Sequence, residues 1–159
     1  MLPHRVLVLL AWSCLCWPHL AKGADQAALF EALGGGRAAA LIRHAIAPGI
    51  GSPAEFRIYD CGTQRNLSDE GREQARAVGD RLRAGGIARA AIYSSQWCRC
   101  LETARLLDLG EVIELPALNS LFNDRSRAEQ QTGELTALLR AALPSDPLVL
   151  VTIRSTSGR

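Results

Sequence analysis

Apolar residues along this chain gather in short runs that alternate with amphipathic segments. The runs predict strands at residues 38–43, 87–93, 112–115 and 148–153. Apolar spacing of three and four residues predicts helices at residues 25–33, 68–84, 98–109 and 134–143. Such alternation is typical of an α/β fold, so we expect a three-layer α/β/α sandwich with a mostly parallel sheet.

Polar residues lie directly at the ends of two of the predicted strands. Arg43 and His44 close the first apolar run, residues 94–96 follow the second, and Arg99 falls in the first turn of the next helix. Open α/β sheets bind ligands at the carboxyl ends of their strands. The helix dipole disfavours a cation in the first turn unless an anion lies nearby, so Arg99 indicates a bound phosphate or carboxylate. The alternative is a capped strand with a surface histidine.

The first 23 residues have the pattern of a secretory signal peptide. His4 and Arg5 form the basic start, residues 6–17 the apolar core, and residues 21–24 a small-residue cleavage region near 23/24. We therefore expect a signal peptide, residues 1–23, and one domain, residues 24–159, in the periplasm or secreted. The apolar core is too short for a stable membrane span. A lipoprotein cleavage site at Cys14 is the alternative.

Cleavage at this site would change the charge and the histidine content. The 18 basic residues lose Arg5 and Lys22 and then equal the 16 acidic residues, so the remaining domain has no net charge. This balance argues against nucleic acid as a partner, since binding it requires a basic face. His44 would be the only histidine left, which excludes a zinc site built on several histidines.

Three cysteines lie beyond the signal peptide, and in an oxidising compartment one disulfide is expected among them. Cys61 belongs to a long irregular segment, residues 46–66, which we expect to shape a pocket because idle loops of this length are uncommon. A bond from Cys61 to either Cys98 or Cys100 would tie this loop to the end of the sheet where His44 lies. A three-thiolate metal site is the alternative, and it has no fourth ligand nearby in the sequence.

Three motifs carry a resemblance to a known family. They are Leu-Ile-Arg-His-Ala at 41–45, Asn-Leu-Ser-Asp-Glu-Gly-Arg-Glu-Gln-Ala at 66–75, and Ser-Ser-Gln-Trp-Cys-Arg-Cys-Leu-Glu-Thr-Ala at 94–104. In order and spacing they resemble the phosphoglycerate mutase-like histidine phosphatase superfamily. The signal sequence and the cysteines resemble its exported, periplasmic branch. Ala45 replaces the glycine that usually follows the Arg-His pair.

The resemblance implies a role for each motif. His44 would be the nucleophile that takes the phosphoryl group as phosphohistidine, and Arg43 and Arg99 would bind the phosphoryl oxygens. The family needs neither a metal nor another cofactor, so positioning and electrostatics would carry the reaction. Expected partners are a phosphorylated small molecule or a phosphorylated surface glycan.

In this family a carboxylic acid usually protonates the leaving alcohol. That residue comes from the segment between the second helix and the last strand. Asp124 is the candidate general acid in this chain. Glu129 is the second candidate. For both residues the alternative is an ordinary solvent-exposed charge in a loop.

The end of the chain departs from the resemblance. The family's last strand is followed by a second catalytic histidine, and Ile153 stands in that place. Residues 154–159 show no apolar pattern, so we expect the C-terminal portion of the fold to be missing or truncated. One hypothesis is a frameshift, since restoring a lost C after the Thr152 codon lets the next codon encode histidine. The alternative is a genuine divergent end.

Loss of the second histidine predicts a metal-independent phosphomonoester hydrolase with impaired activity, because one phosphate-binding group is missing. The alternative is a pseudophosphatase, a non-catalytic domain that binds phosphate or a partner through Arg43, His44 and Arg99.

Overall fold

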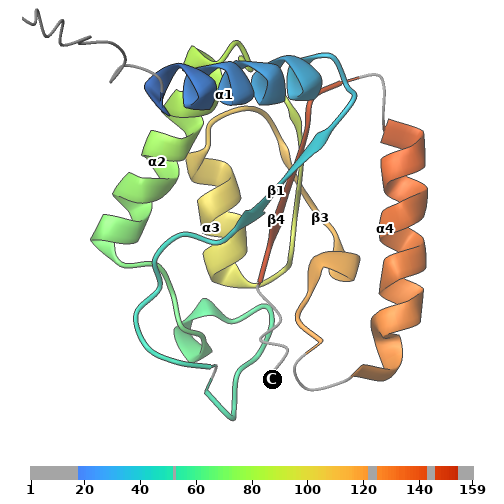
Figure 1. Cartoon of the computed structure of the whole chain (residues 1–159). Coiled ribbons are helices and arrows are strands. Elements are labelled where there is room, and N and C mark those ends of the chain that lie inside the picture. Colours follow the sequence, from blue (N-terminus) through green and yellow to red (C-terminus); the bar gives the residue numbers. More distant parts are fainter. Residues whose placement is uncertain (1–17, 52, 122–124, 143–145, 154–159) are drawn as a thin grey trace, which may run out of the picture.

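The computed structural model describes residues 18–51, 53–121, 125–142 and 146–153, and a parallel sheet forms the centre of this part of the chain (Figure 1). The strands are β1 (Ala39–Arg43), β2 (Ala91–Ser94), β3 (Val112–Glu114) and β4 (Leu148–Thr152). They pair in parallel in the order β1-β4-β2-β3. The predicted α/β fold with a parallel sheet is confirmed.

Helices cover both faces of this sheet. They are α1 (Pro18–Gly34), α2 (Asp69–Ala84), α3 (Cys98–Leu106) and α4 (Ala128–Ala142), with short 3-10 turns η1 (Cys61–Thr63), η2 (Pro116–Leu118) and η3 (Arg125–Arg127). Figure 1 shows α2 and α3 on one face, α4 on the other, and α1 across the end where the strands begin. This arrangement is the expected three-layer sandwich.

Alternate residues of β4 belong to the two halves of the core. Val149 and Val151 pack in the cluster that contains Leu107 of the α3 side, whereas Leu148 and Leu150 pack in the cluster that contains Leu138 of α4. Leu148, Val149 and Val151 are fully buried. A strand apolar on both faces is expected only in the middle of a sheet covered on both sides.

The strands end at nearly the same level. Arg43 pairs with Thr152, and Ser94 pairs with both Val151 and Glu114. The residues that come directly after β1, β2 and β4 (His44, Ser95 and Ile153) therefore lie at the same end of the sheet, opposite α1. This geometry positions the polar residues that follow the strands.

Several element boundaries differ from the prediction. The helix predicted at 25–33 begins at Pro18, so α1 runs through the expected cleavage site near 23/24. The strand predicted at 87–93 begins at Ala91, because Ile87 packs in the core without joining the ladder. The helix predicted at 98–109 ends at Leu106.

The largest boundary error concerns α4, which was predicted at 134–143 and begins at Ala128. Side chains extend this helix: the Thr132 hydroxyl donates to the Ala128 carbonyl at 2.7 Å, and the Gln130 amide donates to Glu134 at 2.8 Å. The i,i+4 pair of Gln130 and Glu134 supports a helical turn that has no apolar stripe. Glu129 therefore lies on a helix, and the expectation of a polar loop there was wrong.

Some expectations fall outside the described residues. They concern residues 1–17 of the proposed signal peptide, Asp124, and the tail at residues 154–159. Within the part of the chain that the structure describes, no helix has the length and apolar character needed to cross a bilayer.

Candidate active site

His44 follows β1 directly and lies where the parallel strands end. Its backbone N–H donates to the Thr152 carbonyl at 3.1 Å, which continues the β1–β4 ladder by one bond. The side chain is buried, with 7% of its surface exposed. The imidazole is thus held at the carboxyl edge of the sheet, where open α/β sheets bind their ligands.

The partners of the imidazole define its tautomer. Nδ1 lies 2.7 Å from the Ala45 carbonyl, which can only accept, so Nδ1 carries the proton. Nε2 lies 3.2 Å from Nε of Arg99, which can only donate, so Nε2 keeps its lone pair. Nε2 is therefore the nucleophilic nitrogen, and it faces a guanidinium.

The surroundings keep this imidazole neutral. Burial is the main cause that lowers the pKa of His44, from 6.5 to about 4, and the positive charges of Arg99, Arg43 and Arg65 lower it further. The hydrogen bond to the Ala45 carbonyl opposes this shift. At neutral pH Nε2 therefore carries a lone pair and no proton, as a nucleophile must.

Arg99 comes from the first turn of α3 and is held on several sides. Only 2% of its surface is exposed, and its guanidinium lies over the Trp97 ring at 4.7 Å from the centroid. One terminal nitrogen donates to the Arg65 carbonyl at 3.2 Å. Burial lowers the pKa of Arg99, but an arginine remains charged at any physiological pH.

Arg43 is the last residue of β1 and its surface is exposed. Its charge contributes to the lowered pKa values of His44, Arg65 and Arg99, so it belongs to the same electrostatic cluster. The structure thus brings together the three residues, Arg43, His44 and Arg99, that the sequence singled out at two separate strand ends.

Arg65 is a further member of the site that the sequence did not indicate. One terminal nitrogen donates to the carbonyls of Ala47 and Gly49, in the loop that follows His44. Burial lowers the pKa of Arg65, and the charge of Arg43 lowers it further. Its Nε is buried and has no hydrogen-bond partner within the described residues.

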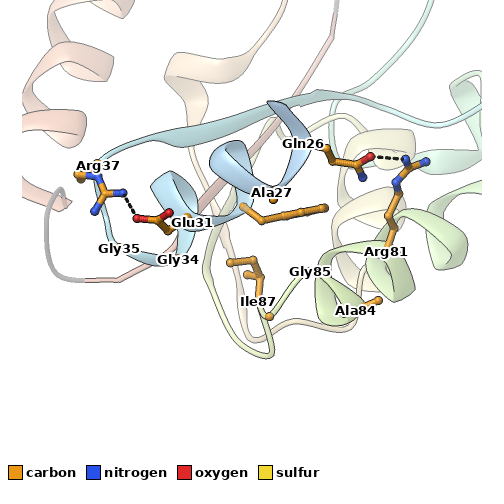
Figure 2. A pocket seen from close by; sticks show the side chains of 12 residues that line it. Gln26, Ala27, Glu31, Gly34, Gly35, Arg37, Arg81, Ala84, Gly85 and Ile87 are labelled. Carbon is orange, nitrogen blue, oxygen red and sulfur yellow. Dashed lines mark hydrogen bonds and ion pairs between the residues drawn. The ribbon is translucent and has the colours of Figure 1, made fainter. Parts of the chain in front are cut away.

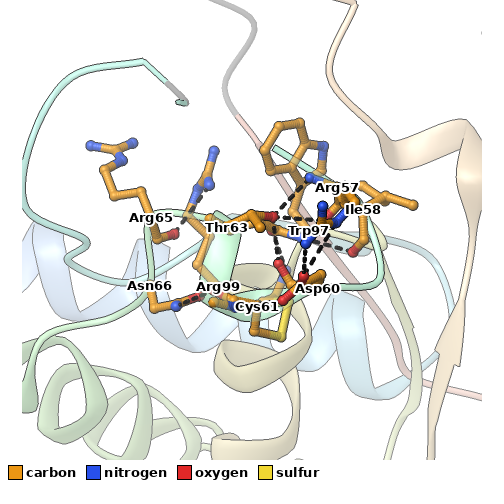
Figure 3. The surroundings of a disulfide bond; sticks show 12 residues. Arg57, Ile58, Asp60, Cys61, Thr63, Arg65, Asn66, Trp97 and Arg99 are labelled. Carbon is orange, nitrogen blue, oxygen red and sulfur yellow. Dashed lines mark hydrogen bonds and ion pairs between the residues drawn. A yellow bond between two sulfur atoms is a disulfide. The ribbon is translucent and has the colours of Figure 1, made fainter. Parts of the chain in front are cut away.

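A disulfide fixes the segment that carries Arg65 (Figure 3). Cys61 is bonded to Cys98 at the start of α3, and Cys100 is a free, buried thiol whose pKa burial raises to about 12. The expected disulfide is confirmed, and Cys98 is the partner that the sequence left open. The bond joins the loop of Arg65 to the helix of Arg99.

Gln64 reinforces this connection and was also missed from the sequence. It is 7% exposed, its amide nitrogen donates to the Arg57 and Ile58 carbonyls at 2.8 and 2.7 Å, and its amide oxygen accepts from the Cys98 N–H at 3.0 Å. The last bond satisfies an N–H at the start of α3 that has no partner within the helix. Gln64 therefore fixes the loop relative to Arg99.

Of the two carboxylates proposed for acid catalysis, the structure describes only Glu129. Asp124 lies outside the described residues. Glu129 is exposed in the first turn of α4, on the face of the sheet opposite α3. The charges that shift the pKa of His44 come from arginines alone.

Ile153 is level with His44 on the neighbouring strand, because it follows Thr152, which pairs with Arg43. Its side chain is partly buried and packs against the main apolar cluster. An isoleucine at this place provides no donor for an anion bound at His44.

A polar network borders the cluster where β2 and β3 end. The side-chain amide nitrogen of Gln96 donates to the Tyr59 hydroxyl at 2.9 Å and to the Glu114 carboxylate at 3.2 Å. The side-chain amide oxygen of Gln96 accepts from the Asn119 amide nitrogen at 2.9 Å. This network links the loop at 46–66 to the end of the sheet. Within the described residues, no group of three or more His, Cys, Asp or Glu side chains has the arrangement of a metal site.

A pocket among the described residues lies away from this cluster. It is an open hollow of about 810 Å³ between α1 and the end of α2, with Phe30, Arg81 and Ile87 among its lining residues (Figure 2). These residues precede β1 and β2, so the pocket lies at the amino ends of the strands. The chemistry concentrates at the opposite edge, around His44, and we place the site there.

The model of the histidine phosphatase superfamily (branch 1) matches residues 40–137, more than half of the chain. No curated protein matches the sequence significantly.

Solved structures resemble the fold at low sequence identity. The protein histidine phosphatase SixA complexed with tungstate is 17% identical, with a TM-score of 0.51, and the match covers 74% of this chain and 68% of that one. The product of an open reading frame of Mycobacterium tuberculosis is 20% identical, with 72% of each chain covered and a TM-score of 0.52. The mycobacterial glucosyl-3-phosphoglycerate phosphatase complexed with VO3 is 20% identical, with a TM-score of 0.50, and the match covers 71% of this chain and 73% of that one.

Proposed function

The chain belongs to the histidine phosphatase superfamily, and from this premise we propose that it is a metal-independent phosphomonoester hydrolase that acts through a phosphohistidine on His44. The observation that carries the proposal is the state of the imidazole. His44 is neutral, its Nε2 lone pair faces Arg99, and the nearby charges that shift its pKa are all positive. A neutral nucleophile among cations suits attack on a phosphate dianion.

In the proposed reaction, Arg99 and Arg43 first bind the non-bridging oxygens of the phosphoryl group. The Arg99 Nε–H then donates to oxygen instead of to Nε2, which frees the lone pair. Nε2 attacks phosphorus, the ester P–O bond breaks, and the leaving oxygen takes a proton. Water then attacks phosphorus, the P–N bond breaks, and inorganic phosphate and neutral His44 are formed.

The proton for the leaving group is assigned to a carboxylic acid. Asp124 remains the first candidate, and Glu129 is the second. Glu129 is exposed on α4, which is a poor position for an acid that must reach a phosphate at His44. We therefore keep Asp124 as the first choice. Replacing each with its amide should slow turnover of alkyl phosphates more than that of p-nitrophenyl phosphate, whose leaving group needs no proton.

The activity is proposed to be impaired, because Ile153 occupies the place of the family's second histidine. Loss of one donor to the transition state costs about 3 kcal/mol, or roughly a hundredfold in rate. Ile153 packs against the apolar core and contributes no such donor. Turnover in Ile153→His should therefore exceed that of the natural chain.

A second candidate function is anion binding without catalysis. The observation that favours it is the same isoleucine, since the remaining arginines suffice to hold an oxyanion without completing a catalytic site. On this proposal the chain is a pseudophosphatase that binds phosphate or a phosphorylated partner.

The compartment and the substrate are part of the proposal. Export through a signal peptide at residues 1–23 is supported by the Cys61–Cys98 bond, since disulfides persist in oxidising compartments. The proposed substrate is a phosphorylated small molecule or a phosphorylated surface glycan. The loop at 46–66 and the network around Gln96 border the place where its leaving group would lie.

Turnover of p-nitrophenyl phosphate in the presence of a chelator tests the enzyme directly. His44→Ala should abolish turnover, and Arg99→Gln should reduce it, whereas the control Arg89→Gln should leave it unchanged because Arg89 precedes β2 at the other end of the sheet. Full turnover by His44→Ala contradicts the enzyme proposal. Absent turnover in the natural chain, together with tungstate binding that survives His44→Ala, favours the pseudophosphatase.

A further inference from the structure

Arg65 carries a buried polar group that nothing in the described part of the chain satisfies. Its Nε is inaccessible to solvent and lacks a hydrogen-bond partner there. Leaving a buried donor unpaired is unfavourable, and more so for a charged group. An unpaired donor of this kind at a candidate active site points to a ligand that completes it.

The contacts of Arg65 connect it to the loop that follows the nucleophile and to Arg99. Its guanidinium is held by the Ala47 and Gly49 carbonyls, which follow His44 in the chain, and its own carbonyl accepts from Arg99 at 3.2 Å. Figure 3 shows the side chains of Arg65 and Arg99 extending in the same direction from this contact. The positive charge of Arg65 also contributes to the low pKa of His44.

The net positive charge of the cluster also indicates that the ligand is an anion. The cations of this cluster act on one another, since the charge of Arg43 lowers the pKa of His44, Arg65 and Arg99. Arg43, Arg65 and Arg99 form no ion pair with a carboxylate among the described residues, and His44 is neutral. Three clustered cations are stabilised by an anion between them.

We propose that Arg65 is a third oxyanion-binding residue, whose Nε–H donates to a phosphoryl oxygen held over His44. The assignment rests on the proposed function for its substrate, but it is testable with an inorganic oxyanion alone. Arg43, Arg65 and Arg99 together supply a donor for each non-bridging oxygen of a tetrahedral phosphoryl group. Arg65 stabilises the bound phosphate and the charge that its oxygens carry in the transition state.

A purely structural role is the competing explanation, because Arg65 also fixes the loop after His44. The two roles predict different results for Arg65→Gln and Arg65→Lys. The lysine keeps the charge and can reach a carbonyl but has no Nε–H in the same place, so it should restore loop stability more fully than oxyanion affinity. Arg57→Gln is the matched control, since Arg57 lies in the same loop and its exposed side chain pairs with Asp60.

The experiment is calorimetric titration of the full chain with tungstate, together with thermal unfolding with and without the anion. Arg65→Gln should bind tungstate about ten- to a hundredfold more weakly, as expected for one lost charged hydrogen bond, and should lose most of the anion-induced rise in unfolding temperature. Arg65→Lys should fall between the two, and Arg57→Gln should bind as the natural chain does.

Unchanged tungstate affinity in Arg65→Gln would overturn the assignment. So would a variant that unfolds at a lower temperature without ligand but keeps the full anion-induced shift, or an equal loss of affinity in Arg57→Gln. The proposed function fails separately: if His44→Ala keeps full turnover while Arg65→Gln loses tungstate, the hydrolase mechanism is wrong and the role of Arg65 stands.

Discussion

Removing the Cys61–Cys98 bond should cost a large part of the stability of the domain. The two cysteines are 37 residues apart in the sequence, and the bond joins an exposed loop residue to the buried start of α3. A cross-link that closes a loop of this length restricts the unfolded chain by about 4 kcal/mol in the chain-entropy model. Domains of this size are stable by only about 5–15 kcal/mol in total.

The perturbation is the double variant Cys61→Ala/Cys98→Ala, and the assay is urea unfolding with and without reductant. We expect the double variant to lose about 4 kcal/mol and the natural chain to lose a similar amount on reduction. The double variant should not respond to reductant. Cys100→Ala is the control, because Cys100 is a free thiol and its replacement leaves the bond intact.

Two outcomes would refute this reasoning. A natural chain whose unfolding free energy is the same with and without reductant would show that the bond contributes nothing. A Cys100→Ala variant that no longer responds to reductant would show that Cys100, and not Cys98, is paired with Cys61.

Two further predictions concern packing and pH. A Cβ at Gly79 would collide with the Leu107 carbonyl, so Gly79→Ala should lower the unfolding free energy by about 3 kcal/mol. Gly133 faces open space on α4, so the control Gly133→Ala should raise the unfolding free energy by about 0.5–1 kcal/mol. Equal effects of the two substitutions would contradict the close packing of α2 on α3. Since the pKa of His44 is lowered by folding, the stability that it contributes is complete above pH 6.5 and is lost as the pH falls to about 4. This loss reaches about 3 kcal/mol, and His44→Gln should remove that part of the pH dependence in urea unfolding; an unchanged pH dependence in this variant would contradict the buried, neutral imidazole.

The central strand could be predicted because it is buried on both faces. Residues 148–151 are all apolar, and the structure packs them between two layers of helices. The errors in element boundaries arose where the burial of a residue does not match its backbone hydrogen bonding. Ile87 is buried but lies outside the ladder, so an apolar run overstated β2. The start of α4 has no buried stripe apart from Gln131, so periodicity did not reveal it.

The same contrast applies to the candidate site. Arg43, His44 and Arg99 lie at the ends of regular elements, and strand-end geometry alone predicts that they meet. Arg65 and Gln64 lie in an irregular loop, where no periodicity indicates the direction of a side chain. Their placement depends on the disulfide and on long-range bonds to α3. The only signal in the sequence was the proximity of both residues to Cys61.

The most direct test of the proposed mechanism is to trap the phosphoenzyme. The natural chain would be mixed with a phosphomonoester, quenched in alkali, in which phosphohistidine is stable, digested, and analysed by mass spectrometry. We predict a phosphoryl group on His44, and none in His44→Ala. Turnover without any adduct, or with the phosphoryl group on a residue other than His44, would contradict the mechanism.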